Sequence, residues 1–143
     1  MAKTYDVVIV GAGPSGLLAA KAAGQAGFSV ALLERKADIT RLERVCGQTL
    51  VSVNDYYFDD VVHYNRRGKR IAFLKSGFSF AYDGPIKNCA AWHIFSPAGN
   101  RLPFGLPEET RKKGDFGAVG IAYDKEILFR CLLDEVRQAG VDV

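Results

Sequence analysis

The sequence lacks the features that mark several large classes of protein. Its three cysteines, Cys46, Cys89 and Cys131, lie far apart and form no CxxC pair, so we predict neither a disulfide framework nor a metal site. The net charge is only +3, which is too small to indicate nucleic acid as a partner. Because no residue pattern requires an oxidising compartment, we expect a cytoplasmic protein.

A long uninterrupted hydrophobic run is also absent. The stretch from Val7 to Ala23 is rich in apolar and small residues, but Pro14 and several glycines interrupt it, and Lys21 lies within it. It therefore fits neither an export signal nor a membrane span. With 143 residues, 48% of them hydrophobic and 24% charged, the chain has the composition of an ordinary globular domain.

The first part of the chain has the pattern of a parallel βαβ unit. Tyr5 to Val10 is a mostly β-branched run, typical of a strand that is buried on both faces. A helix is predicted from about Ser15 to Ala26, with Gly27 ending it, and Phe28 to Leu33 reads as the next strand. The predicted fold class is therefore α/β, with a Rossmann-like dinucleotide-binding unit.

The middle of the chain predicts β-hairpins. Val61 to Tyr64 pairs with Arg70 to Leu74, and Trp92 to Phe95 pairs with Arg101 to Phe104, each across a turn that contains glycine. The stretch "LPFGLPEETRKKGDFG" has two prolines and three glycines, and we predict a long loop there.

The end of the chain predicts a helix followed by the start of a strand. In "AYDKEILFRCLLDEVRQAGVDV", apolar residues recur on one helix face, Asp124 can cap the N-terminus and Gly140 ends the helix. Val141 to Val143 would then add a strand to the parallel sheet. We therefore expect an incomplete parallel sheet within a larger architecture. A discontinuous dinucleotide-binding domain (1–50 and 120–143) would surround a β-hairpin-rich inserted segment (51–119), the start of a substrate layer.

A GxGxxG turn links the first predicted strand to the first predicted helix. Gly11 permits the tight turn, Gly13 lets the backbone approach a pyrophosphate, and Gly16 lets helix and strand pack closely. Pro14 and Ser15 open the helix, whose N-terminal amides and dipole attract phosphate. We include all five residues in the predicted site.

An acidic residue narrows the choice of dinucleotide. Glu34 ends the second predicted strand, where a carboxylate can accept hydrogen bonds from ribose hydroxyls. It would repel a 2′-phosphate, which disfavours NADP, although Arg35 and Lys36 partly offset this repulsion. NAD and FAD share the same ADP half, so the βαβ unit alone leaves both open.

Both ends of the chain resemble a known group of flavoproteins. "GAGPSG", "LLER" and the later "RVCGQ" are similar to segments of the FAD-dependent oxidoreductases that include the geranylgeranyl reductases and the aromatic-ring hydroxylases. "YDKEILFRCLLDEVRQAGVDV" resembles the segment in which such proteins return to their FAD domain. The resemblance implies FAD as the cofactor.

The resemblance also implies roles for individual residues. The three motif glycines would face the pyrophosphate of FAD, and Glu34 would face the adenosine ribose. Arg35 would lie beside the adenine, Arg44 near the pyrophosphate or the flavin, and Cys46 with Gly47 near the isoalloxazine ring.

By the same resemblance, the leading hypothesis is an FAD-dependent oxidoreductase of geranylgeranyl-reductase-like type, in which the flavin carries the redox chemistry. We expect a small-molecule substrate, apolar or prenyl, and NAD(P)H or another electron donor. An FAD-dependent aromatic-ring monooxygenase and a non-catalytic nucleotide-binding fragment are the alternatives. No residue has the spacing of a general acid or base, so the catalytic residues are unknown.

The remaining polar and aromatic residues have ordinary structural interpretations. His63 and His93 lie in predicted strands and are not spaced as metal ligands. The runs "NRRGKR" and "RKK" are short and typical of solvated surface, so we expect no nucleic acid partner, while a peripheral membrane contact is a secondary hypothesis. The aromatics of the middle segment belong mostly to the core, yet they could also wall an apolar substrate pocket.

Overall fold

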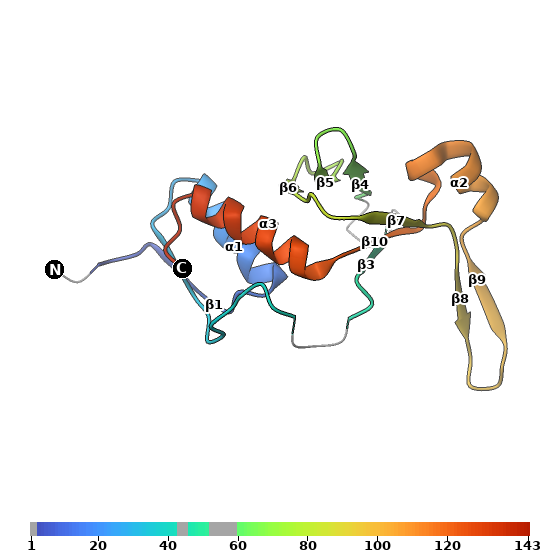
Figure 1. Ribbon diagram of the computed structural model, residues 1–143, viewed down its shortest axis with the longest axis horizontal. Helices are drawn as coiled ribbons and strands as arrows, with labels where there is room; N and C mark the ends of the chain where they lie inside the picture. Colours follow the sequence, from blue (N-terminus) through green and yellow to red (C-terminus); the bar gives the residue numbers. More distant parts are fainter. Residues whose placement is uncertain (1–2, 43–45, 52–59) are drawn as a thin grey trace. The chain divides into compact units, whose positions relative to one another are not determined.

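A computed structural model describes residues 3–42, 46–51 and 60–143, and it divides the chain into two compact units (Figure 1). The first, here called the Rossmann unit, takes Met1–Val45, Phe80–Asp83 and Lys125–Val143. The second, here called the β unit, takes Cys46–Ser79 and Gly84–Asp124. Each unit is described by itself.

The Rossmann unit is built on a parallel strand pair. Its regular elements are β1 (Val7–Val10), α1 (Pro14–Gln25), β2 (Val30–Leu33) and α3 (Lys125–Gln138). β1 and β2 run parallel, with Val7 opposite Val30 and Val10 opposite Leu33. The turn into β2 follows Gly27, whose φ of 88° is the left-handed conformation that ends a helix. The predicted βαβ unit is therefore confirmed.

The C-terminal residues extend this sheet beyond β2. The backbone N–H of Asp142 donates to the carbonyl of Val30 (3.0 Å), and that of Leu32 donates to the carbonyl of Asp142 (2.7 Å). The bridge is parallel, so β2 lies between β1 and the segment that ends the chain. This central place agrees with the burial of Val30, Ala31 and Leu32.

Helices α1 and α3 pack against each other, as Figure 1 shows. A Cβ atom at Gly24 would come within 2.8 Å of the carbonyl oxygen of Ala139, so glycine is required for the close approach. Lys21 of α1 is 2% exposed and pairs with Glu135 of α3, with Nζ and Oε2 3.0 Å apart. A buried ion pair therefore lies inside this helix interface.

The β unit consists of short antiparallel elements. It contains a three-stranded sheet in the order β3-β10-β7, two hairpins and one short helix. The elements are β3 (Thr49–Val51), β4 (Val62–Asn65), β5 (Arg70–Phe73), β7 (Ile86–Cys89), β8 (Trp92–Phe95), β9 (Arg101–Phe104), α2 (Pro107–Lys113), the 3₁₀ turn η2 (Gly114–Gly117) and β10 (Gly120–Tyr123). β6 (Ser79–Ala81) begins in this unit and carries the chain back to the Rossmann unit. Both predicted hairpins, β4-β5 and β8-β9, are confirmed.

The long loop predicted over "LPFGLPEETRKKGDFG" is wrong in its second half. Pro107 occupies the first helical position of α2, where its missing N–H and fixed φ favour a helix start. Glu108 and Glu109 follow in the first turn, and three basic residues fill the last turn, which suits the helix dipole. The prolines and glycines of this stretch therefore lie at or near the ends of secondary-structure elements and do not prevent a helix from forming.

The fold class predicted from sequence, α/β with a Rossmann-like unit and a β-hairpin-rich segment, is confirmed. The domain boundaries proposed above stay a prediction. In the part of the chain that the structure describes, no helix has the length and apolar character needed to cross a bilayer.

Candidate cofactor site

The glycine turn after β1 is shaped by backbone contacts. Gly11 has a φ of 101°, a conformation that favours glycine, and its N–H donates to the carbonyl of Leu33 (2.7 Å). A Cβ atom at Gly16 would overlap the carbonyl oxygen of Gly11. A Cβ atom at Gly13 would meet nothing within 4 Å. Gly16 is thus required for packing, whereas Gly13 leaves open space beside the turn.

The start of α1 supplies amide donors to that space. Gly13 is the N-cap residue and has extended backbone, and Pro14 follows at the first helical position. The amides of Ser15 and Gly16 lie in the first turn, where a helix provides no internal acceptors. No acidic residue occupies this turn, so the positive end of the helix dipole is not neutralised there. An anion would be stabilised at this end of α1.

The Glu34 carboxylate is attached to the glycine turn. Its Oε2 accepts a hydrogen bond from the Ala12 N–H (2.8 Å), and its Oε1 accepts one from the Lys36 N–H (3.0 Å). The hydrogen bond from Ala12, followed by that from Lys36, lowers the pKa of the Glu34 carboxyl below its usual value. The carboxylate is therefore ionised at neutral pH and can only accept hydrogen bonds, as a partner for hydroxyl groups must.

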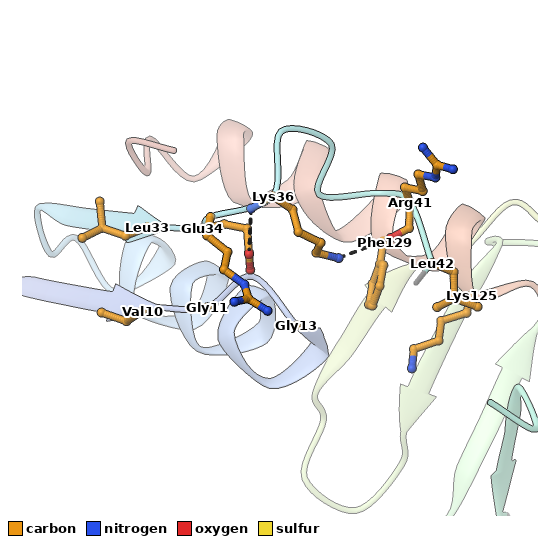
Figure 2. Close-up of a pocket in the computed structure, with 11 residues that line it drawn as sticks. Val10, Gly11, Gly13, Leu33, Glu34, Lys36, Arg41, Leu42, Lys125 and Phe129 are labelled. Atoms are coloured by element: carbon orange, nitrogen blue, oxygen red, sulfur yellow. Dashed lines mark hydrogen bonds between the residues drawn. The ribbon is translucent and has the colours of Figure 1, made fainter. Parts of the chain in front are cut away.

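One cavity of ≈ 480 Å³ is lined by the glycine turn, the Glu34 carboxylate and residues of α3 (Figure 2). This volume lies within the range typical of small-molecule sites, about 300 to 1,000 Å³. Figure 2 shows Val10 and Leu33 at the ends of the two strands, with Phe129 and Lys125 on α3. The lining residues are Val10, Gly11, Gly13, Leu33, Glu34, Arg35, Lys36, Arg41, Leu42, Lys125 and Phe129.

The cavity wall carries more positive than negative charge. Four cationic side chains line it together with the single carboxylate of Glu34, namely Arg35, Lys36, Arg41 and Lys125. Lys36 Nζ donates to the carbonyl of Arg41 (3.2 Å), as Figure 2 also shows. The Lys36 and Lys125 ammonium groups lie 5.8 Å and 5.6 Å from the centre of the Phe129 ring. Such a wall suits a ligand that combines an aromatic ring with phosphate groups.

The predicted site residues divide between the two units. Gly11, Gly13, Glu34 and Arg35 line the cavity, and Pro14, Ser15 and Gly16 form the adjoining start of α1. Cys46 and Gly47 belong to the β unit, and Arg44 lies outside the described residues.

A second, shallower cavity of ≈ 340 Å³ lies within the β unit. Gly47 and Gln48 line it together with Lys87 of β7 and Tyr123 of β10. The Gln48 N–H points to the sulfur of Cys46 (3.4 Å), and Gln48 has a φ of 48°, which is uncommon for a residue with a side chain. Cys46 and Gly47 thus belong to a tight turn at the edge of this cavity.

Comparison with known proteins agrees with this geometry. Residues 4–55 match the family described as the FAD binding domain. The digeranylgeranylglycerophospholipid reductase of Methanosarcina mazei is 29% identical over 143 residues, which is 100% of this chain and 29% of that protein. That of Methanosarcina acetivorans is 27% identical over the same shares. The chain therefore spans 29% of the length of these curated relatives.

The predicted resemblance to the FAD-dependent oxidoreductase superfamily, in its N-terminal portion, is confirmed. The predicted cofactor, FAD, is confirmed by the same comparisons.

Two solved structures show the same fold. A geranylgeranyl bacteriochlorophyll reductase-like protein from Thermoplasma acidophilum superposes with a TM-score of 0.61, at 20% identity, over 99% of this chain and 30% of that one. An aromatic hydroxylase from angucycline biosynthesis superposes with a TM-score of 0.53, at 18% identity, over 98% of this chain and 23% of that one.

Several residues of the cavity wall were not predicted from the sequence. Arg41, Leu42, Lys125 and Phe129 lie in the cavity wall although none of them was predicted as a site residue. One signal was available, because Lys125 opens the terminal helix that was expected to return to the FAD domain. The position of that helix beside the glycine turn could not be read from residue order.

Proposed function

We propose that this chain binds the ADP half of FAD and that the whole protein reduces carbon–carbon double bonds of an apolar, prenyl-type substrate. The observation that carries the cofactor site is the Glu34 carboxylate, attached to the Ala12 amide beside the open space at Gly13. The substrate class rests on the name of the relatives that match along the whole chain, digeranylgeranylglycerophospholipid reductase.

The residues present fit the ADP half of FAD. The carboxylate of Glu34 would accept hydrogen bonds from the ribose hydroxyls, and the amides of Ser15 and Gly16 would donate to the pyrophosphate. Arg35 and Lys125 would balance the phosphate charge, and Phe129 would form part of an apolar wall near the adenine. For Arg44, Cys46 and Gly47 we retain the proposal of contacts to the pyrophosphate or the flavin.

FAD, when bound, supplies two-electron redox chemistry. Saturating one carbon–carbon double bond consumes two electrons and two protons, so NAD(P)H or another donor must return electrons to the cofactor. What this chain contributes is binding and orientation, because its cavity is lined by the glycine turn, the Glu34 carboxylate and four cationic side chains.

Ligand titration tests the cofactor site. We expect the 143-residue chain to bind FAD, ADP and NAD in equilibrium dialysis, and Glu34→Gln to weaken all three by about tenfold, the worth of a charge-assisted hydrogen bond. Glu108→Gln, at an exposed carboxylate of α2 in the β unit, is the matched control and should change none of the affinities. A chain that binds none of the three ligands, or a Glu34→Gln variant with unchanged affinities, would contradict the proposed site.

The same titration separates an enzyme from a nucleotide-binding fragment. A marked preference for FAD over ADP requires contacts to the flavin and supports the oxidoreductase. Equal affinities would mean that only the adenosine half is recognised, as expected for a non-catalytic module.

Product analysis tests the proposed reaction on protein purified with whatever sequence accompanies this chain in its source. Anaerobic incubation with a reduced cofactor and a polyprenyl lipid should add two hydrogens per double bond, detectable by mass spectrometry. Oxygen-dependent hydroxylation of an aromatic compound would support a monooxygenase and overturn the proposed reduction, while leaving the FAD site intact.

We also propose a cytoplasmic setting. The described residues include Cys46, Cys89 and Cys131 as free cysteines, which suits a reducing compartment. The finding of a disulfide in protein purified without reductant would count against it.

A further inference from the structure

The β8-β9 hairpin presents apolar side chains to solvent. In Figure 1 this hairpin extends away from the β3-β10-β7 sheet and from α2 of the same unit. Ile94 is 58% exposed, Phe95 63% and Leu102 60%. Single exposed apolar residues are ordinary, but three on one narrow ribbon form a cluster of the kind that marks interaction sites.

The patch is ordered by strand pairing. Trp92 lies opposite Phe104, and Ile94 lies opposite Leu102, so these four side chains share one face of the ribbon. The rings of Trp92 and Phe104 stack with centroids 6.2 Å apart and are only partly exposed at the base of the hairpin. Ile94 and Leu102 continue this apolar row toward the turn.

The opposite face carries an aromatic residue and positive charge. Phe95 lies opposite Arg101, next to the turn, and His93 contacts the Phe95 ring edge-on at 6.3 Å. The turn itself, 96–100, has no charged residue. Apolar groups are therefore exposed on both faces of the ribbon near its tip.

Charge along this segment has one sign. From Gly84 to Pro107 the sequence contains no aspartate or glutamate, whereas it contains Lys87 and Arg101. Both cationic residues are exposed. A negatively charged surface would be attracted by Arg101 of the hairpin and by Lys87 of the preceding strand β7, and no carboxylate of the hairpin would oppose it.

We infer that the β8-β9 hairpin docks the protein on an anionic phospholipid surface. Near its tip the ribbon exposes apolar side chains on both faces beside the cationic Arg101, a combination that suits the interfacial region of a bilayer. Phe95, Ile94 and Leu102 would enter the acyl boundary, and Arg101 would reach the phosphates, as long cationic side chains do at membrane interfaces. This docking requires no flavin, so its test is independent of the test of the proposed cofactor site.

Vesicle binding tests the inference with a probe that the chain already contains. Trp92 is its single tryptophan and lies at the base of the hairpin. With vesicles of equal parts phosphatidylcholine and phosphatidylglycerol, we expect the 143-residue chain to sediment and the Trp92 emission to shift to shorter wavelength. Brominated acyl chains should quench this emission. Vesicles of phosphatidylcholine alone should bind more weakly, because the charge contribution is lost.

Substitutions locate the docking surface. Ile94→Ser with Leu102→Ser should lower the partition coefficient by at least about tenfold, since two apolar side chains no longer leave water. Arg101→Gln should lower it about fivefold on the anionic vesicles only. Phe28→Ser with Leu74→Ser removes two side chains that are 54% and 50% exposed elsewhere and should leave partition unchanged.

Either of two results would overturn the inference. The hairpin variant and the unchanged chain could have equal partition coefficients, or vesicles could leave the Trp92 emission unaltered. Self-association without vesicles, lost in the hairpin variant and accompanied by no vesicle binding, would instead make the patch an interface between copies. If the double variant fails to fold, Phe95→Ser and Arg101→Gln carry the test, because both residues are exposed.

Discussion

In the Rossmann unit the strand β2 is buried along three of its four residues, whereas in the β unit the strand β9 is exposed along three of four. β2 has a neighbouring strand on each side and two helices in its unit, and three of its four side chains are shielded from water. β9 belongs to a two-stranded ribbon with both faces open. The comparison teaches that the proposed cofactor site rests on elements fixed by burial, while the proposed docking surface lies on an element fixed mainly by its own pairing.

The two units also use buried polar groups differently. The Rossmann unit joins two helices through the Lys21 and Glu135 ion pair. The β unit uses the Asp60 carboxylate, 5% exposed, to hold a turn through the N–H groups of Lys75 (2.7 Å) and Ser76 (3.0 Å). The first arrangement links elements distant in sequence, and the second links neighbouring segments. Their removal should therefore have different costs.

Gly16→Ala should have the largest effect and should break the Rossmann unit alone. The added methyl group would overlap the Gly11 carbonyl oxygen, and a backbone overlap should cost more than the about 3 kcal/mol typical of overpacked side chains. Denaturant unfolding followed by circular dichroism would show the loss. Gly13→Ala is the control, because its methyl group meets nothing within 4 Å. It should unfold like the unchanged chain yet bind FAD less tightly. Equal stability of Gly16→Ala and the unchanged chain would contradict the glycine geometry.

Lys21→Met should come next. Removing one partner leaves the Glu135 carboxylate buried without its cation, and the free energy of unfolding should fall by about 3 to 5 kcal/mol. Urea unfolding measures the change. Replacing both partners, Lys21→Met with Glu135→Leu, should restore most of the stability, because no charge is then left buried. If the double variant is as unstable as the single one, the pair is not the reason for the loss.

Asp60→Asn should have the smallest effect, and the size of this effect depends on pH. Burial would raise the pKa of the Asp60 carboxyl, but hydrogen bonds from Lys75, Ser76 and Val61 outweigh it and lower the pKa to about 2 from 3.8. The folded state thus gains stability above the unfolded pKa, and this gain is lost as pH falls from about 4 to about 2. The variant should melt at a lower temperature at pH 7, and the difference should vanish near pH 2.

Asp38→Asn is the matched control for this pH dependence. Asp38 is an exposed carboxylate in the Rossmann unit, and the Thr40 hydroxyl and N–H lower its pKa. Because an exposed group contributes little to stability, this variant should melt like the unchanged chain at every pH. A pH profile of Asp60→Asn parallel to that of the unchanged chain would show that the turn does not depend on the carboxylate.

Much of the fold was predictable because its signals are local. The β-branched run before Gly11, the Gly27 and Gly140 helix ends and both hairpins follow from residues close together in sequence. The short helix α2 was missed because Pro107 was taken as a breaker, although proline is favoured at a first helical position. The strands β3, β7 and β10 were missed because their pairing joins segments that are distant in sequence and leaves little local pattern.

The residues of the proposed cofactor site also fall into those that local spacing predicts and those that only tertiary packing brings to the cavity. Gly11, Gly13 and Glu34 were predictable from spacing, and the structure brings them to one cavity. Lys125 and Phe129 were not, because only the packing of α3 against α1 brings them beside the glycine turn.

By itself, the sequence determined a βαβ unit and a dinucleotide as the class of cofactor. The reason is that a tight glycine turn, a helix start and a strand-end carboxylate act through backbone geometry within a few residues. Tertiary structure decided which cations and which aromatic ring complete the cavity wall, and which apolar side chains remain exposed. Both outcomes depend on contacts between segments that residue order places far apart, and such contacts are set by packing.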